Sequence, residues 1–236
     1  MIIVITHKVS GYDRTPTELT DQLIAEGINV FFTEDTAHIA PETTCVIYTP
    51  AIPHDSIELN YAKANAIPLR KRAEILGELA SQKKCIAVAG SHGKTTVSAM
   101  IAHLLNSSSI GCNAFLGGIA KNFNSNVLIN RQSEFLVVEA DEYDKSFLTL
   151  YPYYTIITSA DADHLDIYQT HENLIRNFNL FANQTQPEGK LFIKMGLDFD
   201  LNDDIQKSTY YFDSLSPDNY TWNLRDRKST RLNSSH

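Results

Sequence analysis

Residues 85–105, CIAVAGSHGKTTVSAMIAHLL, place an apolar run, a glycine-containing turn and a helix-like pattern directly one after another. An all-apolar run of this kind is typical of a strand that is buried on both faces of a parallel sheet. A glycine turn leading from such a strand into a helix lets successive backbone N–H groups face one anion at the helix N-terminus. The segment therefore predicts a strand, a phosphate-binding loop and a helix, an order that belongs to α/β folds.

Each residue type in the turn has a role in phosphate binding. Gly90 and Gly93 supply backbone freedom, while Lys94 can place its ammonium group on terminal phosphates. The Thr95 hydroxyl can bind the magnesium ion that accompanies a nucleotide. The longer pattern G-x-x-x-x-G-K-[ST] is not met, because Val88 stands at its first glycine and leaves the shorter G-x-x-G-K-T. The alternative is an ordinary strand–turn–helix junction, but the flanking strand and helix favour the phosphate interpretation.

Two further apolar runs, FLVVEA (135–140) and TIITSA (155–160), end in polar residues. Ligands of open parallel sheets bind beyond the carboxyl ends of the strands, so we expect both ends to meet the glycine turn at one site. Glu139 directly follows its apolar run and is the candidate magnesium ligand, because a hard cation prefers carboxylate oxygens. The other acidic residues of this segment are interpreted as a solvated turn: Asp141, Glu142 and Asp144.

Three histidines lie in or near these segments. A single loop histidine is usually structural, but His164 follows a third buried strand and is therefore a candidate ligand of a second metal or a phosphate contact. His92 lies inside the glycine turn and is interpreted as a residue that shapes the loop. His103 falls on the following helix, where a packed or surface histidine is the simplest interpretation.

The N-terminal third of the chain alternates short β-branched runs with capped helical patterns. In residues 15–27, TPTELTDQLIAEG, Thr15 is the predicted N-cap and Pro16 the first helical residue. Glu18 is predicted to close a capping box, and Gly27 follows the end of the helix. Alternation of strands and helices implies a parallel sheet with crossover helices.

Other segments follow the same rules of patterning and capping, including a second capping pattern at Asp55 and Glu58. The predicted strands are NVFFT (29–33), CVIYT (45–49) and KLFIKM (190–195), and the predicted helices are DSIELNYAKANA (55–66), RKRAEILGELAS (70–81) and HENLIRNFNLFANQ (171–184).

The polar QKK after residue 81 is the predicted domain boundary, which divides the chain into residues 1–82 and 83–226. Residues 227–236, RKSTRLNSSH, are polar, basic and without periodicity, so we interpret them as a non-native tail that resembles a translated cloning scar. The alternative for this tail is a natural disordered C-terminus.

The formal charge of −8 argues against a nucleic-acid or anionic-membrane partner, because those partners require a basic surface. The three cysteines, Cys45, Cys85 and Cys112, are widely spaced and predict neither a disulfide framework nor a zinc site, which suits the cytoplasm. The initial MIIVI is too short for a signal-peptide core, and no apolar run is long enough to insert into a membrane.

Three motifs in this order, GSHGKTT, EADEYDKSFL and DADHLDIY, resemble the central domain of the Mur ligase family. SGYDRTPTELTDQL, YTPAIP and RKRAEILGEL resemble the family's N-terminal domain, and the likeness covers roughly residues 8–226. The resemblance implies an α/β fold: a truncated Rossmann-like N-terminal domain that binds a UDP-sugar, followed by an incomplete P-loop ATPase domain with a parallel sheet.

Within the family, the segments resemble most the members that join UDP-N-acetylmuramate to L-alanine in peptidoglycan biosynthesis. The resemblance implies that the substrate's lactyl carboxylate attacks the γ-phosphate of ATP, giving an acyl phosphate. The amine of L-alanine then attacks this intermediate to form the amide, and ADP and phosphate are released. ATP and two Mg²⁺ ions are therefore the expected cofactors, with UDP-N-acetylmuramate and L-alanine as the expected substrates.

The resemblance also assigns site residues. The ATP phosphates are expected in the loop formed by Gly90, Ser91, His92, Gly93, Lys94, Thr95 and Thr96. Thr95 and Glu139 are the expected ligands of the first magnesium and His164 of the second, with Lys94, Glu139 and His164 as the catalytic residues. LGGIAKNFNSN resembles the segment facing the muramyl substrate, which places Gly117, Gly118 and Asn122 near the UDP-sugar.

Two departures from the family pattern affect the expected activity. The glycine-rich turn G-I-G-G-I-G that binds the UDP pyrophosphate has no counterpart here, and neither has the family's C-terminal domain. We therefore expect a fragment truncated at both ends, with little or no ligase turnover by itself. The alternatives are the recycling ligase that attaches a tripeptide to UDP-N-acetylmuramate, and a non-ligase nucleotide-binding ATPase or switch.

Overall fold

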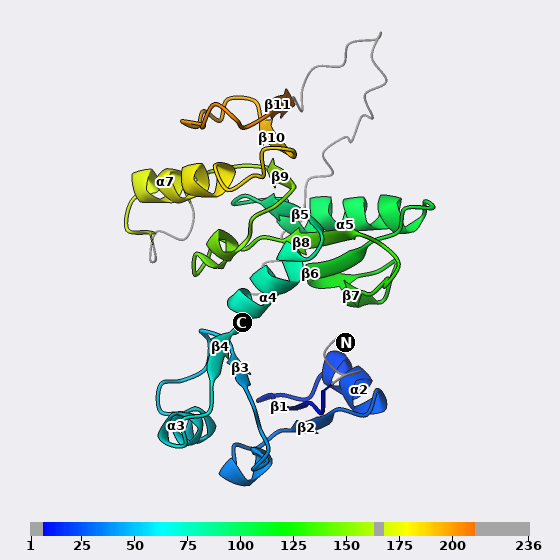
Figure 1. The fold of residues 1–236 in the computed structure, drawn as a ribbon, viewed down its shortest axis with the longest axis vertical. Coiled ribbons are helices and arrows are strands. Elements are labelled where there is room, and N and C mark those ends of the chain that lie inside the picture. The colour runs from blue at the N-terminus through cyan, green and yellow to red at the C-terminus, as the bar shows by residue number, and fades with distance from the viewer. Residues whose placement is uncertain (1–6, 163–167, 211–236) are drawn as a thin grey trace, which may run out of the picture.

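The computed structural model describes residues 7–162 and 168–210. These residues form two parts joined by helix α4 (Arg72–Ser81), as Figure 1 shows. The N-terminal part contains two separate two-stranded sheets, and the larger part is built on one seven-stranded sheet. Both parts alternate strands with helices, which confirms the predicted α/β class.

The seven-stranded sheet has the order β11-β10-β9-β5-β8-β6-β7 and is parallel except for the antiparallel pair β6–β7. Its strands are β5 (Lys84–Ala89), β6 (Asn113–Ala120), β7 (Ser125–Leu128), β8 (Phe135–Glu139), β9 (Tyr154–Ile157), β10 (Lys190–Lys194) and β11 (Lys207–Tyr210). The predicted strands β5, β8, β9 and β10 are confirmed. Because β5 lies between β8 and β9, the three polar strand ends adjoin as expected.

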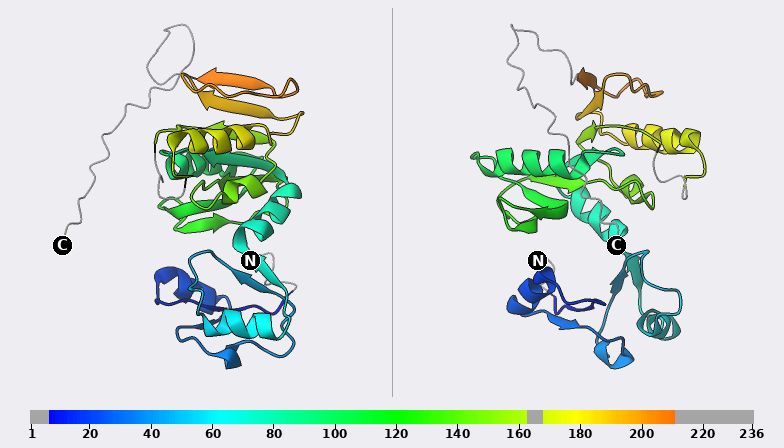
Figure 2. Two further views of the ribbon diagram at one scale, coloured as in Figure 1. Left: turned by 90° about the vertical axis from the view of Figure 1, so that its left-hand side faces the viewer. Right: turned by 180° about the vertical axis from the view of Figure 1, so that it is seen from behind.

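Helices cover both faces of this sheet, which explains why β5 is apolar at nearly every position. One face packs against α5 (Lys94–Asn106), and the other packs against α4, η2 (Ser146–Thr149) and α7 (His171–Ala182), as two views in Figure 2 make visible. Along β5, Cys85 and Ala87 join the core on the α7 side, whereas Ile86 joins the core beneath α5. The strand is therefore buried on both faces, as predicted.

Three phenylalanines form the centre of the core on the α7 side. Phe147, Phe178 and Phe181 have no exposed surface, and the Phe147 ring lies 5.6 Å from Phe178 and 4.8 Å from Phe181 between centroids. Burial of each such side chain stabilises the fold by roughly 1.5–3 kcal/mol. These ring contacts fix the 3₁₀ turn η2, which follows the acidic segment after β8, against helix α7.

The N-terminal part contains two small α/β units. Strands β1 (Ser10–Tyr12) and β2 (Asn29–Phe31) pair in parallel, and α2 (Glu18–Ala25) connects them. Strands β3 (Val46–Tyr48) and β4 (Leu69–Lys71) also pair in parallel and are connected by α3 (Ile57–Ala64), with η1 (Thr36–His38) between the units. Parallel pairing with crossover helices is confirmed, but the described strands form two sheets where the sequence suggested one.

The predicted cap of the first helix is wrong by two residues. Helix α2 begins at Glu18, and its N-cap is Thr17, whose hydroxyl accepts a hydrogen bond from the N–H of Thr20 at 3.2 Å. The Thr20 hydroxyl in turn accepts a hydrogen bond from the Thr17 N–H at 2.8 Å and closes the capping box in place of Glu18. Thr15 lies in the preceding turn because Asp13 Oδ1 accepts a hydrogen bond from its N–H at 3.0 Å.

The cap of the second predicted helix is also displaced. Helix α3 is capped by Ser56 and not by Asp55, because Ser56 Oγ accepts a hydrogen bond from the Leu59 N–H at 3.2 Å. The Ser56 hydroxyl also bonds Glu34, which lies before η1. After α2, Gly27 has φ 89°, and the predicted helix end at this glycine is confirmed.

Helix α4 follows β4 without an intervening residue and packs against η2 and β5, so it contacts both parts. A Cβ at Gly77 would lie 2.6 Å from the carbonyl oxygen of Thr149, and the Thr149 hydroxyl donates to the Ala73 carbonyl at 3.0 Å. The division into residues 1–82 and 83–226 stays a prediction, and the predicted tail 227–236 lies outside the described residues. Within the described ranges, no helix combines the length and apolarity needed to cross a membrane.

Candidate nucleotide and metal site

The loop between β5 and α5 depends on glycine at two positions. Gly90 has φ 135° and Gly93 has φ 84°, which L side chains rarely adopt. A Cβ at Gly90 would lie 2.2 Å from Thr158 Oγ1 and 2.8 Å from the Ser159 nitrogen. The loop backbone therefore presses against the residues that follow β9, and any larger residue at Gly90 would displace it.

Polar residues after β9 hold the loop in place. The N–H groups of Ser91 and His92 donate to the carbonyl oxygen and the hydroxyl of Ser159, at 3.3 and 2.8 Å respectively. The Ser91 hydroxyl donates to the Asp161 carbonyl at 2.8 Å, and Thr158 Oγ1 bonds the carbonyls of Ala89 and His92. His92 shapes the loop through its main chain, as predicted. The bracing by Thr158 and Ser159 was not predicted, although both residues belong to the TIITSA segment.

The first turn of α5 presents backbone N–H donors at the end of this loop. The earliest helical hydrogen bond runs from the Val97 N–H to the Gly93 carbonyl at 3.0 Å. Among the residues that the structure describes, no acceptor is recorded for the N–H groups of Lys94, Thr95 and Thr96. Such groups at a helix N-terminus, together with the helix dipole, form an anion-binding site. The geometry therefore agrees with phosphate binding at these three residues.

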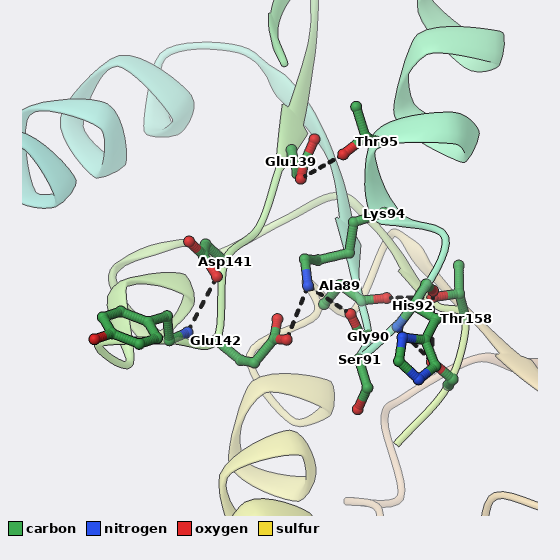
Figure 3. Close-up of polar contacts among 12 residues, drawn as sticks. Ala89, Gly90, Ser91, His92, Lys94, Thr95, Glu139, Asp141, Glu142 and Thr158 are labelled. Carbon is green, nitrogen blue, oxygen red and sulfur yellow. Dashed lines mark hydrogen bonds and ion pairs between the residues drawn. The ribbon is translucent and has the colours of Figure 1, made fainter. Parts of the chain in front are cut away.

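Lys94 projects from this turn toward the segment after β8 (Figure 3). Its Nζ lies 2.8 Å from Glu142 Oε1 and donates to the Gly90 carbonyl at 2.8 Å. The Lys94 side chain is 14% exposed and the Glu142 side chain is not exposed at all. The interpretation of Glu142 as part of a solvated turn is therefore wrong.

Two neighbouring aspartates shape the chain around Glu142. Asp141 accepts a hydrogen bond from the Tyr143 N–H at 3.1 Å, and Asp144 accepts one from the Ser146 N–H at 3.0 Å. These bonds, each to a residue two positions later, are Asx turns; the first contains Glu142 and the second follows it. Both aspartates are exposed, so the predicted solvated turn is confirmed for them alone.

Tyr168 closes the other side of this segment. Its hydroxyl donates to the Glu142 carbonyl, and the ring is nearly fully buried. Burial raises the pKa of the Tyr168 hydroxyl well above its usual value, and the nearby carboxylates of Glu142, Asp141 and Asp144 raise it further. The phenol therefore stays protonated and keeps its role as a donor.

Glu139, at the end of β8, holds a second set of contacts. Its Oε1 accepts a hydrogen bond from the Thr95 hydroxyl at 2.9 Å, and its Oε2 accepts one from the Gly117 N–H at 2.7 Å. The two candidate magnesium ligands therefore meet at the N-terminus of α5, and both offer the hard oxygen atoms that Mg²⁺ prefers. This pair fits a magnesium ion that accompanies a nucleotide in the loop.

The remaining predicted ligand, His164, lies outside the described residues. Within the described ranges, no three side chains of His, Cys, Asp or Glu converge as a metal-binding group. Of the predicted metal ligands, Glu139 and Thr95 are the two that the described residues bring together.

The three residues expected near the UDP-sugar lie at different places. Gly117 adjoins the Glu139 carboxylate, and Gly118 lies beside Thr95, with 3.7 Å from an added Cβ to Thr95 Cγ2. Asn122 is exposed in the turn between β6 and β7. Contact of these residues with a UDP-sugar stays a prediction.

A small cavity of about 100 Å³ adjoins the Glu139 carboxylate. It lies between α4, β6, η2 and the end of β8, and its lining includes Arg72, Gly117, Glu139 and Asp141. The cavity therefore borders the candidate metal site at Glu139, on the side on which α4 approaches the sheet.

Comparison with known protein families assigns both parts of the chain. Residues 1–84 match "Mur ligase family, catalytic domain", and residues 88–231 match "Mur ligase middle domain". The chain is 44% identical over 225 residues to the UDP-N-acetylmuramate–L-alanine ligase of Parabacteroides distasonis, covering 92% of this chain and 48% of that protein. It is 45% identical over 226 residues to the ligase of the same name from Porphyromonas gingivalis W83, covering 93% and 50%.

Solved structures agree with this assignment. The UDP-N-acetylmuramate–alanine ligase MurC of Thermotoga maritima matches with a TM-score of 0.73 and 27% identity, covering 82% of this chain and 45% of that one. The UDP-N-acetylmuramate:L-alanyl-γ-D-glutamyl-meso-diaminopimelate ligase of Neisseria meningitides shares the fold, with a TM-score of 0.77 and 21% identity over 89% of this chain and 72% of that one. The chain spans about half the length of the curated relatives it matches. It belongs to the Mur ligase family.

Proposed function

We propose that this chain carries the nucleotide-binding part of an ATP-dependent ligase that joins L-alanine to UDP-N-acetylmuramate in peptidoglycan biosynthesis. The observation that carries the proposal is the meeting of Thr95 and Glu139, at 2.9 Å, on a loop whose helix N-terminus presents N–H groups with no acceptor among the described residues. The identity of 44–46% to relatives named for L-alanine ligation supports the choice of amino acid.

In the proposed reaction, a carboxylate oxygen of the muramyl substrate attacks the γ-phosphorus of ATP, and the bond to the bridging oxygen of ADP breaks. The amine of L-alanine then attacks the acyl carbon, phosphate leaves, and the amine loses a proton. Both reactants of the first step are anions that repel each other, so alignment and charge neutralisation supply most of the catalysis. Bound magnesium supplies part of that neutralisation.

In this proposal some residues of the chain bind the phosphates and the metal, and others hold the loop in position. The N–H groups of Lys94, Thr95 and Thr96 and the ammonium group of Lys94 bind the phosphates. Gly90 and Gly93 allow the loop to turn, and Ser91 and His92 fix it to the end of β9. Thr95 and Glu139 hold the metal, and His164 is the proposed ligand of a second Mg²⁺. Gly118 and Asn122 are proposed to face the UDP-sugar.

Lys94 must change partners when a nucleotide binds. Its ammonium group is held by Glu142 and by the Gly90 carbonyl, and the terminal phosphates replace at least one of these contacts. Glu142 thus holds the Lys94 side chain near the loop and compensates its charge until the nucleotide binds.

We also place the protein in the cytoplasm, where ATP is available and free thiols such as Cys45 persist.

Calorimetric titration of the chain with ATP in the presence of Mg²⁺ tests nucleotide binding. Lys94→Ala should weaken the affinity roughly 10-fold to 100-fold, the usual effect of losing a hydrogen bond to a charged group. Lys63→Ala, on the exposed surface of α3, is the matched control and should leave the affinity unchanged. Equal affinities for the wild-type chain and Lys94→Ala would contradict the proposed loop.

The ligation itself is tested with the complete product of the gene that encodes this chain. ADP release should require both UDP-N-acetylmuramate and L-alanine, and mass spectrometry should detect the amide product. Preference for the tripeptide L-alanyl-γ-D-glutamyl-meso-diaminopimelate would instead identify a recycling ligase. ATP turnover that is independent of the sugar nucleotide would favour a non-ligase ATPase.

A further inference from the structure

The backbone of Gly117 lies unusually close to the Glu139 carboxylate. Gly117 belongs to β6, which pairs with β8 at Asn113–Phe115 and then leaves the regular ladder. On its other side, the register between β6 and β7 shifts between Phe115 and Ala120. Gly117 thus falls in the irregular segment, where its N–H donates to Glu139 Oε2 at 2.7 Å instead of to a neighbouring strand.

This contact leaves no room for a side chain at position 117. An added Cβ would lie 2.4 Å from Glu139 Oε1, 2.5 Å from Cδ and 2.6 Å from Oε2. All three distances are shorter than real Cβ contacts, so any side chain here would force the carboxylate to rotate away. Gly117 does not have a positive φ, so the collision with Glu139 and not backbone strain requires glycine.

The adjacent glycine differs in this respect. A Cβ at Gly118 would meet Thr95 Cγ2 at 3.7 Å, an ordinary van der Waals contact, and Gly118 also lacks a positive φ. The two neighbouring glycines have the same backbone freedom, but one of them alone touches the carboxylate. They therefore form a matched pair for separating the effect on Glu139 from a general effect of glycine replacement.

We propose that Gly117 is a positioning residue for the metal site, and not solely part of a substrate-facing segment. Its N–H holds one carboxylate oxygen, and its missing side chain lets the other oxygen face the Thr95 hydroxyl. Glu139 is thus oriented before any cation binds, with one oxygen held by the main chain of β6 and the other by the Thr95 hydroxyl. Partners of this kind, which orient a metal ligand, typically contribute 10-fold to 100-fold to metal affinity.

This inference rests on the proposed function, because it assumes that Thr95 and Glu139 hold the Mg²⁺ that accompanies ATP. Its test is a Mg²⁺ titration of ATP binding by the 236-residue chain without sugar nucleotide, together with ATP binding in EDTA and thermal melts. Gly117→Ala should raise the Mg²⁺ concentration that gives half of the maximal increase in ATP binding (the Mg²⁺ midpoint) tenfold or more. Its ATP affinity in EDTA should stay within about twofold of the wild-type value. Gly118→Ala should leave the Mg²⁺ midpoint within about twofold of the wild-type value, because the proposed role of Gly118 concerns the sugar nucleotide, which is absent from this titration, and an added Cβ meets Thr95 only in ordinary contact.

A double-variant comparison establishes that the effect passes through Glu139. In a Glu139→Ala background, Gly117→Ala should add nothing to the Mg²⁺ midpoint, because the carboxylate it displaces is gone. If Gly117→Ala lowers the thermal midpoint of the chain, Glu139→Ala should restore it by relieving the collision. A thermal loss that Glu139→Ala does not relieve would contradict the proposed contact.

The remaining outcomes separate this inference from the proposed function. A wild-type chain whose ATP binding does not depend on Mg²⁺ would overturn the proposed function and this inference with it. Normal Mg²⁺ dependence in the wild-type chain and in Gly117→Ala would overturn this inference alone. Equal effects of Gly117→Ala and Gly118→Ala would also overturn it, since the carboxylate contact is what distinguishes them.

Discussion

The N-terminal part and the seven-stranded part use the same local design with very different burial. Both consist of parallel strands connected by helices. Of the six residues in β5, five are buried, whereas β3 has no buried residue. In the N-terminal part the described buried apolar residues are few, namely Ile28, Leu59 and Ala62.

This difference shows which part of the molecule fixes the positions of the candidate site residues. A parallel sheet is stable when both faces are covered, and the seven-stranded sheet meets that condition. The loop and the carboxylate of Glu139 both begin at ends of strands that are buried on both sides. The core therefore fixes the geometry of the site. We expect substitutions in the seven-stranded part to lower stability more than comparable substitutions in the N-terminal part.

The largest contrast is expected between glycines of the two parts. Gly90→Ala should destabilise the fold by roughly 5 kcal/mol, the combined effect of overlap with the Ser159 backbone and an unfavourable φ. Gly11→Ala, in β1, meets nothing within 4 Å and should change stability by less than about 0.5 kcal/mol. Urea unfolding followed by circular dichroism measures both, and similar losses in the two variants would contradict the comparison.

Two buried leucines give the next largest contrast. Leu191→Ala, in the core beneath α7, should cost about 4 kcal/mol, because the side chain is fully buried in a large core that cannot collapse into the cavity. Leu59→Ala, in α3, should cost about 2 kcal/mol, since its surroundings are more open. The same urea titrations test this, and a larger loss at Leu59 would reverse our ranking of the two parts.

A third contrast concerns ion pairs. Glu142→Gln should lower stability by about 2 kcal/mol, because Lys94 loses its charged partner in a site with little solvent. MgATP should then raise the melting temperature of Glu142→Gln by more than that of the wild-type chain, since the phosphates replace the missing charge. Glu42→Gln, which breaks the exposed Lys8–Glu42 pair, should change neither quantity measurably. An unchanged response to MgATP in Glu142→Gln would show that Glu142 and the phosphates do not compete for Lys94.

The smallest effect is expected at the cap of α2. Thr17→Ala should cost about 1 kcal/mol, because the Thr20 N–H loses its acceptor. Thr15→Ala is the control and should have almost no effect, although the sequence pattern alone indicated Thr15 as the cap. Chemical denaturation that resolves the N-terminal part measures both, and a larger loss at Thr15 would favour the cap inferred from the pattern.

The parts of the fold that the sequence predicts well are those with strong, continuous patterns. The apolar runs of β5, β8 and β9 were identified, and their polar ends correctly indicated that Lys94, Thr95 and Glu139 lie close together. These inferences depend only on strand burial and on the parallel order of the sheet. Strands β1 (SGY) and β4 (LRK) were missed because they contain few of the β-branched and aromatic residues that marked the equally short β2 (NVF) and β3 (VIY).

The contacts that were missed join segments far apart in the chain. Burial of Glu142 depends on the reach of Lys94 from another element and on two Asx turns, and an acidic sequence does not reveal either. The close contact of Gly117 with Glu139 similarly depends on where β6 leaves its ladder. In both cases the role of a residue depends on a neighbour that is distant in the sequence. Residue type and local pattern were therefore not enough to predict that role.

The order of strands in the large sheet also affects how the molecule forms during translation. β5 is the first of the seven strands to be synthesised, yet it lies inside the sheet, and its partners β8 and β9 follow only after β6 and β7. Pairings of such high sequence separation form slowly. The phosphate loop therefore cannot acquire its bracing from Thr158 and Ser159 until the ribosome has made β9, and until then the nascent chain carries an exposed apolar segment that chaperones recognise.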